Sequence, residues 1–384
     1  MKELVKLIHS QQEDGEEIIE IADRHITADR TVHIYDETVF RNCEIEVISH
    51  NAPRFIIGED ASVTFQSCRF IGTLKGQEDG AHSPVISAEE GSSVMFQNCR
   101  FEDTDSILDS DGEVNFLGCE VTCGGKEAHN DKDRETASDD QYLPRRSAAV
   151  GAIGAMIAAT AKMSFGASKC RLISADGEDV TIANCNFSCE PNDCRVSLSA
   201  PHGDLQNCVL NGIYEIEADI LRGCTVKNSA AVNIQTEDGF NEATNCRFED
   251  CGKIFATDAT FSDCEITNLH SGFTLEESTV TKCMFRDITP DSDGMIDLVN
   301  TDFNNCVFEN ITLKNDYYLI SSDNGSSLNN CSFKNCRTGR EDLKLITNGE
   351  FEGFFQNRWV EDDICYGCTG LDRVIYLEDW EGED

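Results

Sequence analysis

Cysteine is the residue type in this chain with the most obvious capacity for chemistry. The chain of 384 residues contains 20 cysteines, and thiolates bind zinc, attack electrophiles and form disulfides. One pair, Cys365 and Cys368, has the Cys-x-x-Cys spacing of zinc and redox motifs. A structural zinc site needs a second such pair, which the sequence lacks. The pair is therefore a weak signal for zinc or for redox chemistry.

A second group of possible ligands consists of Cys185, Cys189, Cys194 and His202. These residues are loosely spaced, and Cys185 already belongs to the repeat described below. The spacing does not favour a metal ion. We therefore expect neither a metal site nor a cofactor.

The charge of the chain limits its partners. Asp and Glu number 71 and Lys and Arg number 31, so the net charge is −40. Such a surface repels phosphate, which argues against direct binding of nucleic acid and of anionic membranes. The first residues, MKELVKLIHSQQEDGEE, contain no apolar stretch typical of a signal peptide. We expect a cytoplasmic protein, in which thiols stay reduced.

A repeat explains most of the cysteines. Units such as FQSCRF, FQNCRF and FNNCVF recur along the chain, and in each unit the residue two positions after the cysteine is apolar. The cysteines of these units are Cys43, Cys68, Cys99, Cys119, Cys170, Cys185, Cys208, Cys224, Cys246, Cys264, Cys283, Cys306 and Cys331. Small, weakly polar thiols suit crowded buried positions. We interpret them as core residues that stack in a column.

Short strands must position this column. Apolar residues alternate with polar ones before and after each cysteine, and a second apolar run precedes each unit after an acidic or glycine turn. Phe96 and Phe101 cannot share one straight strand because they are five positions apart, so a corner is expected at Asn98, where Asn tolerates the left-handed conformation. The asparagines expected to stack at this corner are Asn42, Asn98, Asn184, Asn207, Asn245, Asn305 and Asn330. Stacked side-chain amides can hydrogen-bond to one another.

Repeated strand–turn–strand–corner–strand units predict an all-β fold, a right-handed parallel β-helix of about fourteen rungs. We expect three segments: an N-terminal cap at 1–16 with a short helix over Lys2–Gln11, the β-helix at 17–370, and a C-terminal cap with an acidic tail at 371–384. Within the cap, the strand-like residues 374–377 are expected to cover the last rung. Phe355 to Arg358 are expected to form a fourteenth corner, with Arg358 in the cysteine position.

These repeats and the asparagine stack resemble the pectin lyase-like superfamily of right-handed parallel β-helices. Many members of that superfamily act on acidic polysaccharides, so the resemblance implies a possible lyase or hydrolase. Asn300-Thr301-Asp302 matches the first three residues of the polygalacturonase pattern, but Phe303 replaces the glycine that follows. No Gly-His-Gly occurs in the chain, and the catalytic motif is incomplete. Asp302 is expected to point outward, before the core residue Phe303.

Interruptions of a regular repeat are where function is expected. The longest one contains a charged loop at 124–147, whose candidate binding residues are Lys132, Arg134, Tyr142, Arg145 and Arg146. Arg145-Arg146 could also be a protease site. The following Ala- and Gly-rich segment, 148–161, is interpreted as an ordinary rung that continues through Met163 to Phe165. The alternative is a membrane-inserting peptide released by cleavage.

Three functional hypotheses follow. The leading one is a non-catalytic intracellular scaffold that binds a protein partner through its acidic lateral surface and the 124–147 loop. The second is a polysaccharide lyase or glycoside hydrolase on the lateral face, which would need paired acids beside an Arg or Lys. The third is a substrate of a regulatory protease that cuts near Arg145-Arg146.

Overall fold

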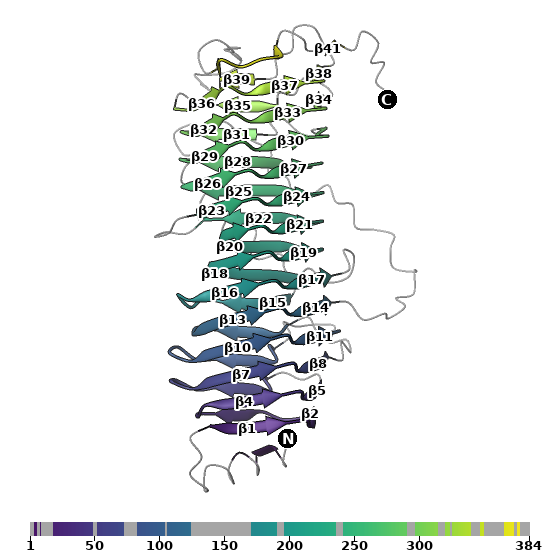
Figure 1. Cartoon of the computed structure of the whole chain (residues 1–384), viewed down its shortest axis with the longest axis vertical. Helices are drawn as coiled ribbons and strands as arrows, with labels where there is room; N and C mark the ends of the chain where they lie inside the picture. Colours follow the sequence, from purple (N-terminus) through teal and green to yellow (C-terminus); the bar gives the residue numbers. More distant parts are fainter. Residues whose placement is uncertain are drawn as a thin grey trace, which may run out of the picture.

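The chain forms one coil of stacked β-strands that runs from β1 at one end to β39 and β41 at the other (Figure 1). The computed structural model describes residues 4–5, 8, 18–48, 52–72, 83–103, 106–123, 170–189, 196–235, 241–289, 296–313, 319–322, 325–338, 346–348, 365–371 and 375–376. All strand pairs in the described residues are parallel, each strand pairing with its equivalent in the next rung. This arrangement is the predicted parallel β-helix.

Each rung contributes three strands in a fixed order, which we call faces 1, 2 and 3. Face 1 comprises β3 (Val32–Ile34), β6 (Phe55–Ile57), β9 (Ile86–Ala88), β12 (Leu108–Ser110), β15 (Cys170–Ala175), β22 (Ala231–Ile234), β25 (Lys253–Thr257), β28 (Gly272–Glu276), β31 (Ile296–Val299), β35 (Ile320–Ser322) and β39 (Ile346–Asn348). Face 2 comprises β1 (Ile19–Ala22), β4 (Thr38–Arg41), β7 (Ser62–Gln66), β10 (Ser93–Gln97), β13 (Glu113–Leu117), β16 (Val180–Ala183), β23 (Asn241–Thr244), β26 (Ala259–Ser262), β29 (Thr279–Thr281), β32 (Asp302–Asn304), β36 (Ser327–Asn329) and β40 (Cys365–Tyr366). The longer strands β18 (Val196–Gln206) and β20 (Glu215–Arg222) run through both faces and join them into one 25-stranded sheet.

Face 3 is a separate 13-stranded sheet. It comprises β2 (His25–Ala28), β5 (Glu44–Val47), β8 (Arg69–Gly72), β11 (Arg100–Glu102), β14 (Glu120–Cys123), β17 (Asn186–Cys189), β19 (Val209–Asn211), β21 (Thr225–Lys227), β24 (Arg247–Glu249), β27 (Glu265–Thr267), β30 (Met284–Arg286), β33 (Val307–Glu309) and β37 (Ser332–Lys334). A third, small sheet contains β34 (Thr312–Leu313), β38 (Arg337–Thr338) and β41 (Ile375–Tyr376).

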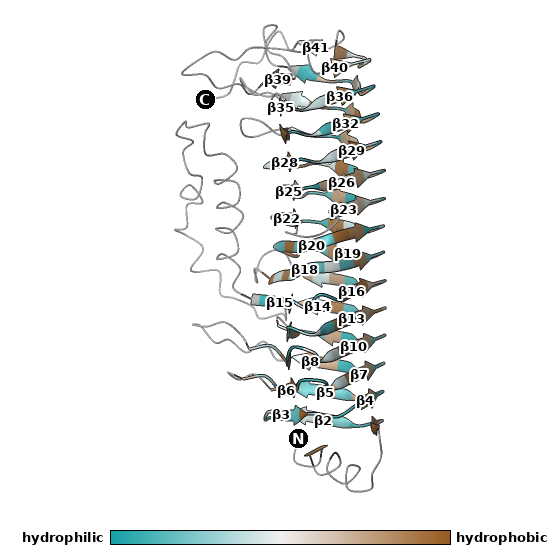
Figure 2. Ribbon diagram, turned by 90° about the vertical axis from the view of Figure 1, so that its left-hand side faces the viewer, coloured by the Kyte–Doolittle hydropathy of each residue, from teal (hydrophilic) through white to brown (hydrophobic). Residues whose placement is uncertain are grey.

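Exact register places like residues above one another in the core. Phe96 pairs with Phe65 below and with Phe116 above, and the ring centroids are 5.3 and 4.4 Å apart. All three side chains are fully buried. Hydrophobic residues recur in this way from rung to rung along the stacked strands (Figure 2). A core of this kind is held by burial of apolar surface and by stacked rings.

The cysteine column is confirmed for twelve of the thirteen predicted members, from Cys43 to Cys331, all of which are buried and none of which is in a disulfide. The thiols donate to backbone carbonyls of the rung below, for example Cys99 to Phe65 at 3.1 Å and Cys246 to Leu221 at 3.2 Å. Each buried sulfur therefore has a polar partner.

Cys170 was wrongly assigned to the column. It is the first residue of β15 and pairs with Val196 on face 1. The backbone ladder passes directly from Cys119, whose carbonyl accepts from Asn186, to the rung of Cys185. A cysteine followed two residues later by an apolar residue is also compatible with the start of a strand, which explains the error.

The predicted corner is also confirmed. The seven predicted asparagines have φ between 52° and 57°, in the left-handed region. Glycines take the same place at Gly118, Gly223 and Gly367. An added Cβ at Gly118 would meet the Asn98 amide oxygen at 2.7 Å, so this glycine leaves room for the asparagine below. One side-chain bond in the stack joins the Asn42 amide to Asp23 at 3.3 Å.

A second corner, which the sequence analysis missed, lies four residues after each column cysteine in the C-terminal half. Its left-handed residues are Asn228, Asp250, Asn268, Asp287, Asn310 and Asn335. Here the side chains form the ladder that was expected at the first corner. Asn335 donates to Asn310 at 2.7 Å, and Asn310 donates to Asp287 at 2.9 Å.

The turn between face 1 and face 2 has its own ladder, made of hydroxyl groups. The backbone N–H of Ser278 donates to Thr301 Oγ1 at 3.2 Å, and the Thr301 N–H donates to Ser326 Oγ at 3.0 Å. Thr301 is fully buried, Asn300 has φ 51°, and Asp302 is exposed beside buried Phe303, as predicted. These structural roles account for the Asn300-Thr301-Asp302 triplet.

The described strands pass from β14, which ends at Cys123, to β15, which begins at Cys170, and residues 124–169 between them lie outside the described residues. Because β12 pairs directly with β15, Leu108 opposite Ile173, no rung lies between them. The interpretation of 148–161 as an ordinary rung is therefore wrong. The five candidate loop residues, from Lys132 to Arg146, lie outside the described residues.

The two ends differ from expectation in one respect. Residues 2–11 are described only at three positions, and the described residues contain no helix among their elements, so the capping helix stays a prediction. Leu4 and Ile8 are buried against the core. At the other end the last corner is Tyr366-Gly367-Cys368 and not Asn357-Arg358, because β40 pairs with β36. Ile375 pairs with Arg337, which places a strand of the predicted cap over β38.

Candidate functional site

Eight exposed carboxylates line the turns between face 1 and face 2 in four consecutive rungs. We call them the acidic edge: Glu59, Asp60, Glu89, Glu90, Asp111, Asp176, Glu178 and Asp179. Backbone bonds stack these turns, since Asp111 N–H donates to Ala88 at 3.1 Å and Asp176 N–H donates to Ser110 at 2.9 Å. Stacked rungs lie about 4.8 Å apart, so the carboxylates form a dense linear array.

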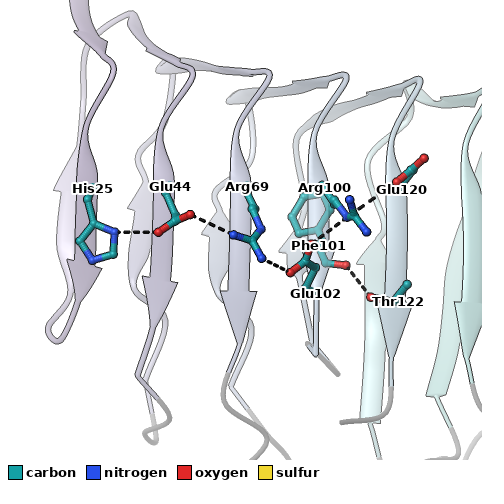
Figure 3. Close-up of polar contacts among 8 residues, drawn as sticks. All are labelled: His25, Glu44, Arg69, Arg100, Phe101, Glu102, Glu120 and Thr122. Carbon is teal, nitrogen blue, oxygen red and sulfur yellow. Dashed lines mark hydrogen bonds and ion pairs between the residues drawn. The ribbon is translucent and has the colours of Figure 1, made fainter.

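The acids of the acidic edge form no ion pair among the described residues, although Arg171 and His202 lie near enough to Asp176 to affect its pKa. Most acids of face 3 do have a basic partner. Figure 3 shows the face 3 arrangement near the N-terminal end, which we call the charge ladder. His25 Nδ1 lies 3.0 Å from Glu44, and Arg69 bridges Glu44 at 3.0 Å and Glu102 at 2.6 Å. Arg100 continues the ladder from Glu102 at 2.7 Å.

A second part of the charge ladder crosses the C-terminal half of face 3. Lys227 lies 2.8 Å from Glu249, and Arg247 lies 3.4 Å from the same carboxylate. Arg286 pairs with Glu265. The acids of the charge ladder thus have basic partners on face 3, whereas the acids of the acidic edge form no ion pair among the described residues.

Side chains of mixed charge gather at the C-terminal end of the acidic edge. This central cluster consists of Arg171, Asp176, His202 and Glu217. Burial raises the pKa of Asp176, and the negative charges of Asp109 and Asp111 raise it further. Burial also raises the pKa of Glu217, which accepts a hydrogen bond from Ser199 Oγ at 2.7 Å.

The bent strand β18 positions His202 in the central cluster. The register between β18 and β20 shifts between Ala200 and Asp204, so the chain bulges outward at Pro201-His202-Gly203. A side chain at Gly203 would meet the Ala200 Cβ at 2.7 Å, so only glycine fits the bend. His202 Nδ1 lies 3.9 Å from Asp219.

The metal ligands considered from the sequence do not form a site. Cys185 lies in the column, Cys189 is buried opposite Cys123 in the face 3 register, and His202 is exposed at the acidic edge. Cys194 lies outside the described residues. Within the described ranges, no three His, Cys, Asp or Glu side chains are arranged to hold a metal ion. The same ranges contain no helix long and apolar enough to cross a membrane.

Sequence reasoning noticed the acidic turns but did not identify them as a site. The signal was present, because an Asp or Glu pair recurs between the two apolar runs of successive rungs. The register between strands of neighbouring rungs decides which acids have a basic partner. The spacing of residues in the sequence does not reveal this register.

Comparisons with known proteins find similar solved structures at low sequence identity and no family. No protein-family model and no curated protein matches the chain. A solved surface adhesin of Streptococcus pneumoniae, PfbA, shares 12% identity at a TM-score of 0.41, covering 92% of this chain and 91% of that chain. The catalytic domain of a GH87 alpha-1,3-glucanase in complex with nigerose shares 11% identity at a TM-score of 0.35. That match covers 89% of this chain, which spans 65% of the glucanase domain. By its own strand pairing, the chain has the parallel β-helix fold.

Proposed function

We propose that this protein is a non-catalytic binding scaffold that holds a basic segment of a protein partner along the acidic edge. The observation that carries the proposal is the contrast between the two sides of the coil. The acids of the charge ladder on face 3 are paired with Arg and Lys, whereas the eight acids of the acidic edge have no ion pair in the described part of the chain.

Like charges held about 4.8 Å apart repel one another, and a rigid sheet cannot move them apart. Burial is the first cause of the raised pKa of Asp176, and the negative charges of Asp109 and Asp111 raise it further, as repulsion between neighbouring acids does. A partner rich in Lys and Arg relieves the repulsion, whereas phosphate or an anionic membrane increases it. We therefore propose that the partner is a protein. The cytoplasm stays the proposed location, as expected from the sequence.

The 124–147 loop is proposed as a second contact, because in the sequence it connects the rungs of Asp111 and Asp176. Its residues Lys132, Arg134, Tyr142, Arg145 and Arg146 remain candidates for that role. Cleavage near Arg145-Arg146 remains an alternative, and it is tested by mass spectrometry of the chain from its native cells. An intact chain under every growth condition would remove it.

The test of the scaffold uses a fluorescent oligolysine peptide as the basic probe. The edge variant combines Glu59→Gln, Asp60→Asn, Glu89→Gln and Glu90→Gln. The matched control, the ladder variant, combines Glu44→Gln, Glu102→Gln, Glu249→Gln and Glu265→Gln, and it changes the net charge equally.

We expect the edge variant to bind the probe at least about tenfold more weakly at low salt, and the ladder variant to lose much less, because local fields decide electrostatic binding. Equal losses in both variants would show that the probe senses net charge alone. That result would remove the acidic edge as a site.

The central cluster favours a second candidate, a glycoside hydrolase that acts on a neutral glycan. Asp176 and Glu217 have raised pKa values and lie with Arg171 and His202, which is the combination of paired acids and a base that such chemistry needs. The acidic edge disfavours polyuronates. Glu217, which is half-buried, would be the proton donor.

A panel of neutral and acidic polysaccharides tests this candidate by release of reducing ends. Cleavage that Glu217→Gln abolishes and that Glu178→Gln leaves intact would establish it. The absence of cleavage by the unmodified chain across the panel would remove it.

A further inference from the structure

Cys365 and Cys368 differ from the other cysteines in exposure. Both are partly exposed, whereas every other cysteine whose side chain the structure describes is buried. Tyr366 between them has 57% of its surface exposed. Solvent and small solutes therefore reach the chain at this corner, which is the last first-corner turn among the described residues.

The geometry of the corner brings the two thiols together. Cys365 pairs with Leu328, so it occupies the inward position that a large apolar residue fills in the preceding rungs. Gly367 has φ 65°, and a Cβ there would meet the Asn330 amide oxygen at 2.6 Å. This turn directs Cys368 into the cysteine column, where its thiol donates to the Leu328 carbonyl at 3.4 Å.

Burial raises the pKa of the Cys368 thiol, and the nearby thiols of Cys331 and Cys365 also affect it. In the preceding rungs the inward residue before the corner is Leu328, Phe303 or Val280. Two inward positions flank the first corner, one before it and one after it. Among the described rungs, the last is the one in which both positions hold a cysteine, Cys365 and Cys368.

We propose that Cys365 and Cys368 are a redox-active dithiol that closes to a disulfide by exchange with a small disulfide such as oxidised glutathione. The first thiolate attacks a glutathione sulfur, forms a mixed disulfide and releases one reduced glutathione. The second thiolate then attacks the protein sulfur of that mixed disulfide and releases the second. Two thiols are oxidised, one glutathione disulfide is reduced, and the two thiol protons pass to the released glutathione.

The disulfide closes a loop within the corner of the final rung. The outer side of this rung is the end of the coil, where strand backbone needs a cap. A covalent link between β40 and the corner would fix the backbone conformation of this corner. The dithiol is therefore a site through which thiol–disulfide balance can act on the C-terminal cap.

The test uses the full chain and one tryptic peptide. Cleavage after Arg358 and Arg373 gives a peptide, 359–373, that contains Cys365 and Cys368 as its sole cysteines. The reduced protein is incubated with oxidised glutathione, its remaining thiols are blocked by an alkylating reagent, and the peptides are weighed by mass spectrometry.

We expect peptide 359–373 to carry an internal disulfide, without alkyl groups or glutathione, while peptides from the buried column stay reduced. Buried thiols react through opening of the fold, so their modification should be at least about tenfold slower. Modification of column cysteines at the same rate, or fully alkylated 359–373, would overturn the proposal.

Variants separate a dithiol from two independent thiols. Cys368→Ser should leave Cys365 trapped as a glutathione mixed disulfide, and Cys336→Ser, which removes a buried thiol outside the pair, should leave disulfide formation unchanged. Glutathione on both cysteines of the unmodified chain would show that the thiols react separately, and would also overturn the proposal.

Discussion

At the scale of single residues, the coil depends on backbone conformations that few residue types adopt. The first corner uses φ values near 50° to 66°, and Asn, Asp and Gly fill most of its positions. A residue with a Cβ and no compensating side-chain bond costs about 1–2 kcal/mol in this region. The repeat therefore tolerates exchange between Asn and Gly more easily than exchange with other residues.

Asn245 allows this to be tested, because the equivalent position one rung earlier is Gly223. Asn245→Ala should lower stability by about 1–2 kcal/mol, since alanine is strained at φ 53°. Asn245→Gly should lower stability by only a few tenths of that amount. Hydrogen exchange of the flanking strands β23 and β26 measures the effect locally, and equal protection in the two variants would contradict it.

Buried thiols make stability depend on alkaline pH. Burial raises the pKa of Cys251 and of Cys336 to about 11 from an ordinary value of 9.0. Below pH 9 each thiol is neutral in both folded and unfolded chains, so no pH dependence arises. Between pH 9 and about 11 the unfolded chain loses the proton first, so folding weakens as pH rises, by about 1.4 kcal/mol per pH unit for each thiol.

Cys251→Ala should flatten the alkaline loss of stability, because one of the thiols with a raised pKa no longer titrates. Denaturation midpoints of the unmodified chain and the variant at pH 8, 9, 10 and 11 provide the measurement. Parallel curves would show that Cys251 does not contribute. Lys and Tyr titrate in both proteins, so their effects cancel in the comparison.

At the scale of elements, each face has a distinct means of joining its rungs. Face 3 uses the charge ladder, and the turn between faces 1 and 2 uses buried hydroxyls in the C-terminal half and stacked acids in the N-terminal half. The hydroxyl ladder satisfies backbone N–H groups inside the coil, so it is part of the core. The charge ladder is exposed and contributes less.

Arg69 tests the charge ladder because it bridges two rungs. The pKa of its guanidinium is raised first by Glu102 and then by Glu44. Arg69→Gln should lower the Tm slightly at low ionic strength and leave it unchanged in 1 M NaCl, where exposed pairs are screened. Arg30→Gln, which removes a pair with the adjacent Asp29, is the control. A salt-independent loss would point to lost packing.

The sequence predicted elements that depend on local periodicity and missed those that depend on contacts between rungs. Alternation around Asn98 and Cys99 located face 2, the first corner and face 3. The second corner at Asn310 escaped because three-residue strands give little periodic signal. Cys170 and Arg358 were misplaced because their local patterns fit a corner, whereas the pairing of β12 with β15 and of β36 with β40 decides the register.

The sequence shows which acidic residues lie in the turns of the candidate site, but it does not show which of them form ion pairs. Acidic pairs such as Glu89-Glu90 are visible in the sequence, but so is Glu102, which the fold pairs with Arg69 and Arg100. Only the register between rungs separates neutralised acids from those of the acidic edge. His202 joins the cluster because β18 bulges, which depends on the close approach of Gly203 to Ala200.

At the scale of the whole molecule, two electrostatic effects oppose each other. Salt weakens the attractive pairs of face 3 and also weakens the repulsion among excess acids. With 71 acids and 31 bases, no arrangement of ion pairs can neutralise more than 31 of the acids. Repulsion should therefore dominate, because it acts between many groups within one Debye length, about 10 Å at 0.1 M salt.

We therefore expect the Tm to rise as NaCl increases from 10 mM to 1 M, although the charge ladder alone predicts a fall. The edge variant should start from a higher Tm at low salt and respond less to NaCl, because four mutually repelling charges are gone. The ladder variant should lose attraction as well as charge, so its Tm at low salt should lie below that of the edge variant. Thermal unfolding by circular dichroism at matched ionic strengths separates the two. A Tm that falls with salt, or variants that respond alike, would show that the acidic edge is not a centre of repulsion, and the case for a basic partner would lose its physical basis.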